Sequence, residues 1–340
     1  MDNHKLLTFS SAVVAVFVLG VVLKTAKSVF FPFFLALLIY FILSPVLEFL
    51  NRKLKLSKTV ALVLVLLVTF VALYFMGAIL FSSGVTLAEE IPTYGSRFER
   101  LLDSVQQGLN LPKTKLDPVT WIKALDIEKV GGFVLSSLGT FFSFVSNIFL
   151  ILIFLIFMLA GRGRINAKIE SAFPPHRSRK VVEILVHIER EVEKYLALKT
   201  LICVGSGLVA WIIMAAFGLD FAALFGVVTF LLNYIPNIGS FIAKMFPFII
   251  GLLQFDNGWT AIWMLVLLTI TDGVIGMILE PRLMGKRLGL SPLAILVALF
   301  SWGWLWGIPG MILAVPILAV MKIIAGNFPS LRLVEALLSK

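Results

Sequence analysis

Long apolar runs recur along this chain, and several approach the roughly 20 residues that an α-helix needs to cross the hydrocarbon core of a bilayer. Residues of the AVILMFWYC set make up 60% of the 340 residues, and charged residues make up only 14%. A soluble domain carries about 25% charged residues, so lipid must be the main solvent. We expect an all-α polytopic membrane protein, which excludes most soluble enzymes and nucleic-acid binders. The runs lie at 6–23, 29–50, 59–82, 139–160, 199–217, 218–254, 258–280 and 289–324.

Two long polar segments, 83–138 and 162–198, lie between some of these runs. In 83–138, apolar residues recur at three- and four-residue steps, which predicts an amphipathic helix outside the membrane, with a second short helix at 119–136. Either segment could pack on the membrane domain, or serve as an oligomer contact or gate. The predicted parts are 1–82 with spans 1–3, the segment 83–138, span 4 with a cytosolic amphipathic helix in 139–198, a C-terminal core in 199–325, and a cytosolic tail in 326–340.

Basic residues gather in three of the connecting segments. The loop 51–58, the segment 162–199 and the loop 281–287 are all rich in Lys and Arg, whereas 83–138 holds six basic and seven acidic residues. Because Lys and Arg concentrate in cytoplasmic loops, we expect cytoplasmic N- and C-termini and an external 83–138 segment.

Two of the apolar stretches are interrupted in the same way. Residues 218–250 and 289–321 each open with Gly-Leu, reach an Ile-Pro pair, and carry a second Pro further on. Since Pro breaks a helix, each stretch predicts a helix, a break and a helix, with halves short enough for a re-entrant hairpin. We expect about six full spans plus two re-entrant hairpins, or eight or more spans if the hairpins cross. The alternative is two ordinary kinked helix pairs. The predicted hairpin tips, and candidate gates, are Pro236, Gly239, Gly307, Pro309 and Gly310.

Polar residues within the apolar stretches mark a candidate binding site. Asp272 lies inside the run 258–280, where a carboxylate costs about 2.5–3.5 kcal/mol and needs a partner or a wet cavity. It either binds a substrate or ion, or pairs with Lys244 in a structural role. Glu280 is expected to pair with Arg282 at the cytosolic mouth. The candidate substrate- or ion-binding residues are Asp272, Thr269, Thr271, Asn233, Asn237 and Glu280.

The sequence lacks the residue patterns that several kinds of catalytic, metal or nucleotide site require. The chain has one cysteine, Cys203, and three widely separated histidines, and it carries no P-loop pattern. We expect no catalytic centre, metal site or cofactor, although H⁺ or Na⁺ could serve as a coupling ion. Three tryptophans at 302, 304 and 306 are expected at a membrane interface.

Two signatures resemble a known family. The run Glu280-Pro-Arg-Leu-Met-Gly285, continued by Trp302-Gly-Trp-Leu-Trp-Gly-Ile-Pro-Gly310 and Ala314-Val-Pro316, is similar to the C-terminal signature of the autoinducer-2 exporter (AI-2E) family, and Tyr234-Ile-Pro-Asn-Ile-Gly239 resembles its other signature. The resemblance implies a prokaryotic plasma-membrane protein, a homo-oligomer with a pentamer suspected, that exports a small polar molecule. Some members instead exchange sodium or lithium for protons.

Together, the residues and the resemblance predict a secondary transporter. Inverted repeats with broken helices near the midplane are typical of this class, so we expect alternating access with Asp272 as the ion or proton binder. The alternatives are a cation/proton antiporter without organic cargo and a non-transporting membrane scaffold.

Overall fold

The computed structural model is built from helices. It describes residues 20–108, 148–161, 164–235, 238–284 and 289–339, together with 11, 14, 15 and 18. Within these residues there is no β-strand, so the predicted all-α fold is confirmed. The predicted helix at 119–136 and most of the first span, 6–23, lie outside the described residues. Of the predicted fourth span, the structure describes the helix Ile148–Ala160.

Five of the described helices are long and apolar enough to cross a membrane. These candidate spans are Lys27–Arg52, Lys58–Leu87, Ser178–Ala216, Gly258–Leu283 and Gly310–Asn327. The protein is therefore a polytopic membrane protein, as its composition predicted.

The chain forms two compact units. The first contains Met1–Leu67, Asn147–Leu198 and Lys286–Lys340, and the second contains Val68–Ser146 and Lys199–Gly285. The first unit includes α2 (Lys27–Arg52), α6 (Arg164–Ala172), α12 (Pro292–Trp306), α13 (Ile308–Asn327), η3 (Pro329–Leu331) and α14 (Arg332–Leu338). The second includes α8 (Ala222–Leu232), α9 (Ile238–Gln254), α10 (Gly258–Val274), η1 (Ile275–Leu279) and α11 (Glu280–Met284).

Two long helices pass through positions where the sequence suggested a change of environment. The helix α3 runs over 51 residues, Lys58–Gly108, across the predicted boundary at 82. The helix α7 runs over 42 residues, Pro175–Ala216, across the boundary at 198. In both, an apolar span and an amphipathic segment form one continuous helix, since neither junction carries a Pro or Gly pair that would end it.

The extension of α3 beyond its span is held by a polar contact. The Tyr94 hydroxyl donates a hydrogen bond of 3.0 Å to Oδ2 of Asp220, which lies in the turn between α7 and α8. Burial, reinforced by the adjacent Asp220 carboxylate, raises the pKa of Tyr94 above its ordinary value. The neutral phenol is therefore the form that this contact requires.

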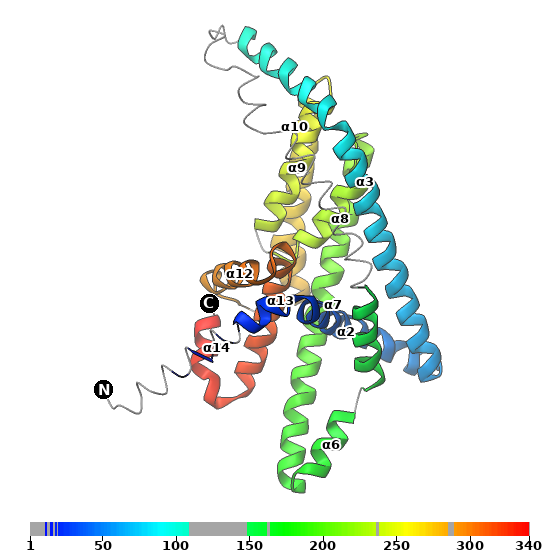
Figure 1. Cartoon of the computed structure of the whole chain (residues 1–340), viewed down its shortest axis with the longest axis vertical. Coiled ribbons are helices and arrows are strands. Elements are labelled where there is room, and N and C mark those ends of the chain that lie inside the picture. The colour runs from blue at the N-terminus through cyan, green and yellow to red at the C-terminus, as the bar shows by residue number, and fades with distance from the viewer. Residues whose placement is uncertain are drawn as a thin grey trace, which may run out of the picture. The chain divides into compact units, whose positions relative to one another are not determined.

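The first interrupted stretch folds as a helical hairpin, α8–α9, which packs beside α10 (Figure 1). Its two ends meet, because Gln254 Nε2 donates to the Gly218 carbonyl at 2.7 Å and the Asp220 backbone N–H donates to Gln254 Oε1 at 2.8 Å. At 11 residues, α8 is about 16 Å long, which is well short of a hydrocarbon core of about 30 Å. A hairpin whose first arm is this short, with both ends at one place, has the geometry of a re-entrant element.

The second interrupted stretch folds as the helical hairpin α12–α13, and it has closures like those of the first. Lys322 Nζ donates to the carbonyl of Gly289, the glycine that opens the stretch, at 2.7 Å. At the tip, a Cβ on Gly310 would collide with the Trp302 carbonyl, just as a Cβ on Gly239 would collide with the Leu232 carbonyl in the first hairpin. The repeat seen in the sequence therefore corresponds to two hairpins closed at base and tip by equivalent contacts. Their inverted orientation stays a prediction.

The arms of the second hairpin differ in length. The helix α12 has 15 residues and α13 has 20, and the portion Gly310–Asn327 qualifies as a candidate span. The sequence placed all three tryptophans of α12 at an interface, but Trp306 is buried. Its indole Nε1 donates to the Leu23 carbonyl at 3.0 Å. Trp304 is 62% exposed, with the Lys24 ammonium 3.8 Å above its ring.

The span that carries the predicted acidic site is not a uniform α-helix. After α10 the backbone widens into one π-helical turn, η1, in which the Glu280 N–H donates to the Ile275 carbonyl five residues back. The chain then returns to α-helix in α11. A π turn inside an α-helix is rare and often marks a functional region.

Candidate functional site

Close glycine packing brings α7 and α8 together beside the predicted site. A Cβ on Gly207 would lie 2.8 Å from the Gly226 carbonyl oxygen, and a Cβ on Gly226 would lie 2.6 Å from Trp211 Cβ. Side chains at these two positions would push the helices apart. The absence of side chains there lets polar groups on α7 and α8 face the same space as α9 and α10.

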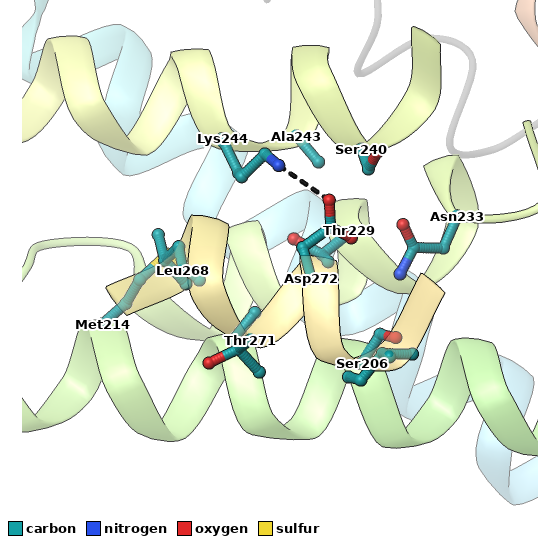
Figure 2. A pocket seen from close by; sticks show the side chains of 12 residues that line it. Ser206, Met214, Thr229, Asn233, Ser240, Ala243, Lys244, Leu268, Thr271 and Asp272 are labelled. Atoms are coloured by element: carbon teal, nitrogen blue, oxygen red, sulfur yellow. Dashed lines mark hydrogen bonds and ion pairs between the residues drawn. The ribbon is translucent and has the colours of Figure 1, made fainter. Parts of the chain in front are cut away.

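An ion pair links α9 to α10 at the centre of this space. Lys244 Nζ lies 2.7 Å from Asp272 Oδ2, and the two side chains are only 18% and 29% exposed, respectively (Figure 2). The pairing that the sequence offered as a structural alternative is thus present. It supplies the partner that an intramembrane carboxylate needs, and it places both charges on the wall of a pocket.

The rest of the pocket wall mixes hydroxyl, amide and apolar side chains. Thr229 and Thr271 each donate a hydrogen bond to a carbonyl four residues back in their own helix, at 2.7 and 2.8 Å. Because a hydroxyl has one proton and two lone pairs, both oxygens keep acceptor capacity. The complete lining is Ser206, Ala210, Met214, Thr229, Asn233, Ser240, Ala243, Lys244, Leu268, Thr271, Asp272 and Ile275.

Ser206, on α7, has an unsatisfied polar atom in this wall. The residue is 5% exposed, and its Oγ has no hydrogen-bond partner among the described residues. A buried hydroxyl without a partner costs about 1–3 kcal/mol. Such a group in a pocket wall points to a ligand or water that completes it.

A second ion pair joins α7 to α11. Lys199 Nζ on α7 is 2.7 Å from Glu280 Oε1 at the start of α11, and the lysine side chain is only 6% exposed. Nearby, the hydroxyls of Thr200 and Tyr234 are 2.7 Å apart and joined by a hydrogen bond, which ties the break of the first hairpin to α7. At 1.5 Å per residue, Lys199 and Ser206 are about 10 Å apart along α7, so the second unit contains two polar layers.

The structure brings together only part of the predicted site. Asp272, Thr271 and Asn233 line the pocket. Thr269 is exposed and does not line it. Asn237 lies outside the described residues. The expected Glu280–Arg282 pair is wrong, because the ion pair of Glu280 is formed with Lys199 on α7.

The predicted tips are likewise divided. Pro236 lies outside the described residues, and Gly239 lies in the first turn of the second arm of the first hairpin. In the other unit, Gly307 has φ +71°, a left-handed conformation that favours glycine, and Pro309 lies in the first turn of α13. Gly310 follows in close contact with Trp302. Gly239 and Gly310 are thus both packed tightly against the preceding arm of their hairpin, and the role of the tips as gates stays a prediction.

Sequence reasoning missed several polar side chains of the second unit. Ser206 and Thr229 are single hydroxyls in apolar helices and carry no distinguishing pattern. Lys199 was counted with the basic cytosolic segment, although it opens the apolar run 199–217 and is 5% exposed. A charge at the start of an apolar run is the signal that could have identified it.

Known proteins resemble this chain over most of its length. Residues 11–330 match the profile of a protein family described as AI-2E family transporter. The chain belongs to the AI-2E transporter family.

Relatives in two bacteria support this assignment. The chain is 32% identical over 304 residues to the AI-2 transport protein TqsA of Escherichia coli, covering 88% of this chain and 86% of that protein. It is 31% identical over 320 residues to YhhT of Escherichia coli, covering 94% and 89%. YueF of Bacillus subtilis is 26% identical over 308 residues, covering 87% and 83%. This AI-2E family member is thus a multi-pass membrane protein with a role in transport.

Proposed function

We propose that this AI-2E family protein is a secondary-active transporter that exports a small polar solute, similar to autoinducer-2, by ion-coupled alternating access. The observation that carries the proposal is the Lys244–Asp272 ion pair in the wall of a pocket formed by otherwise apolar helices. Ionisable residues within membrane spans typically mark ion or substrate pathways. The relative TqsA, named as an AI-2 transport protein, supports the choice of solute.

The proposed coupling step is a change of charge at Asp272. When Asp272 is ionised, its attraction to Lys244 holds α9 against α10. Protonation leaves Lys244 with a neutral partner and weakens that attraction, so the α8–α9 hairpin separates from α10 and the pocket opens. The same separation of the α8–α9 hairpin from α10 would then accompany both proton binding at Asp272 and solute binding in the widened pocket, which couples the two.

The present pocket suits the closed stage of such a cycle. It offers about 20 Å³ to the centre of a water molecule, which is the room that about one water needs. A solute of several heavy atoms does not fit. Solute entry therefore requires the hairpin motion, and Asn233, Ser240 and Thr271 are the polar groups next to the space that opens.

In this proposal the protein lies in the plasma membrane of a prokaryote with both termini in the cytoplasm, and the Lys199–Glu280 layer is nearer the cytoplasm than the Asp272 layer. The basic loop 281–287 supports that direction. A homo-oligomer, with a pentamer suspected, and Na⁺(Li⁺)/H⁺ antiport as the alternative activity, rest on the family resemblance alone.

The test is transport by the purified full-length protein in liposomes. A panel of small polar solutes is loaded and efflux is followed under an imposed pH gradient, with and without sodium or lithium. We expect the pH gradient to drive solute efflux, and Asp272→Asn to abolish it while the folded protein is retained. Thr269→Val, at the exposed face of the same helix, is the matched control and should transport normally.

Three results would count against the proposal. Undiminished coupled efflux by Asp272→Asn removes the carboxylate from the mechanism. Cation–proton exchange without any solute flux favours the antiporter. No flux of either kind, together with a stable protein partner, favours a scaffold.

A further inference from the structure

The pocket beside Asp272 has the size of an ion site. Its volume of about 20 Å³ for the centre of a water molecule matches one water or one monovalent cation. A pocket this small has no room for a solute of several heavy atoms. Its chemistry therefore depends on the single positive charge that lies next to the Asp272 carboxylate.

The polar atoms that surround the space are oxygen donors of the kind that hard cations prefer. Asp272 provides a carboxylate, and the Thr229 and Thr271 hydroxyls keep lone pairs available because their protons are bonded to helix carbonyls. Ser206 contributes a hydroxyl that is buried and has no partner within the part of the chain that the structure describes. These four side chains come from three helices, α7, α8 and α10, and the close contact of Gly207 and Gly226 sets the spacing of the first two.

The cation beside this carboxylate is supplied by the chain itself. The Lys244 ammonium lies 2.7 Å from Asp272 Oδ2 and forms part of the pocket wall. An ammonium is a compact charge of +1 on a flexible stem, so it neutralises the carboxylate as a bound sodium ion would. Among the lining residues, which come from α7, α8, α9 and α10, Lys244 and Asp272 are the ionisable ones. The next charged pair is Lys199–Glu280.

We propose that the Lys244 ammonium occupies the place of a monovalent cation at Asp272, so that this transporter binds no Na⁺ or Li⁺ there, and that removal of the lysine opens a cation site formed by Asp272, Thr229, Thr271 and Ser206. The inference deepens the proposed function and rests on Asp272 being its coupling group. It separates the two candidate activities, because a chain whose own ammonium fills the site is independent of sodium.

The experiment measures cation binding to the purified full-length protein in detergent, and therefore needs no transported solute. Binding of radioactive ²²Na⁺ and the thermal midpoint Tm are compared in NaCl, LiCl and choline chloride at equal ionic strength. The variants are Lys244→Met, which keeps most of the side-chain length without the charge, and the double variant Lys244→Met/Asp272→Asn. Lys199→Met is the matched control, because it removes the ammonium of the other ion pair.

For the wild type we expect no saturable ²²Na⁺ binding and the same Tm in sodium and choline. Lys244→Met should bind about one ²²Na⁺ per chain, and saturating sodium or lithium should raise its Tm by about 2–4 °C, since a ligand that binds only the folded state stabilises it. The double variant should lose both effects. Adding Ser206→Ala to Lys244→Met should weaken the binding, and Lys199→Met should behave as the wild type.

Two results would overturn the inference. The first is saturable, Asp272-dependent ²²Na⁺ binding by the wild type, which would show that the lysine leaves room for the ion. The second is the absence of sodium binding in Lys244→Met and in Lys244→Gln, a second variant that keeps a polar side chain if the first fails to fold. Neither depends on solute flux, so loss of transport in Asp272→Asn and loss of ion binding can be told apart.

Discussion

The energetic coupling between Lys244 and Asp272 provides a quantitative test of the site. Replacing either residue alone, by Lys244→Met or Asp272→Asn, leaves one charge among apolar helices, and such a charge costs about 2.5–3.5 kcal/mol. Replacing both leaves none. The two single changes should therefore not be additive.

The size of the coupling follows from the geometry of the pair. Exposed ion pairs contribute about 0–1 kcal/mol, and breaking a fully buried pair costs about 3–5 kcal/mol. Here the two charged groups are 2.7 Å apart with side chains 18% and 29% exposed, so the pair lies between these limits. We expect a coupling free energy of about 2 kcal/mol.

Reversible unfolding in mixed detergent micelles, with increasing SDS, measures the four free energies of this double-mutant cycle. A cycle of Lys244→Met with Glu280→Gln is the control. Glu280 follows Asp272 by eight residues, about 12 Å along the helix, so this pair should be additive within about 0.5 kcal/mol. If the Lys244–Asp272 cycle is equally additive, the ion pair does not form in the membrane protein and the reasoning about the pocket fails.

Two further predictions concern packing and pH. Gly239→Ala should lower the free energy of unfolding by about 1–3 kcal/mol, because its Cβ would collide with the Leu232 carbonyl. Gly273→Ala, the control, should leave that free energy unchanged or raise it by up to about 1 kcal/mol, since a Cβ there meets nothing within 4 Å. Equal effects of the two variants in SDS titrations would contradict the close packing at Gly239. Tyr94→Phe should lower Tm from neutral pH up to about pH 10, and the difference from the wild type should shrink above that. The folded pKa of Tyr94 is raised, so the stability contributed by its contact with Asp220 is fully present below the ordinary phenol pKa of about 10. That contribution falls as pH rises from there towards the folded pKa, because the phenol of the unfolded chain ionises first. A Tm difference that persists unchanged to pH 12 would refute this.

Much of the architecture could be predicted because lipid imposes simple rules. Spans of about 20 apolar residues, proline breaks and isolated intramembrane charges are all visible in a sequence. They gave the helical class, the two interrupted stretches and the acidic position Asp272. The pairing with Lys244 was also foreseen, because an intramembrane carboxylate needs a partner.

The remaining features depend on contacts that no local pattern encodes. Ser206 joins the site only because Gly207 lets α8 approach α7. Glu280 was assigned to Arg282, its sequence neighbour, yet its ion pair is with Lys199, which is 81 residues earlier in the chain. Trp306 was placed at an interface by composition, but its indole donates to a backbone carbonyl in the N-terminal part of the chain. In each case, tertiary packing decided the environment of the side chain.

The π turn η1 determines how the two carboxylates of this span are oriented. In an uninterrupted α-helix, about 100° per residue would leave Glu280 rotated by roughly 80° from Asp272. One π turn adds one residue to the helix, which reduces the offset to about 20° and aligns the two acids. Deleting a single residue from Ile275–Leu279 would restore ordinary α-helix and keep the offset at about 20°, whereas closing the wide turn without a deletion would rotate Glu280 away from Lys199 by about 100°. The span therefore keeps its two acids in phase only while the wide turn lies between them, and migration of that turn along the helix would reorient one carboxylate without unwinding the backbone.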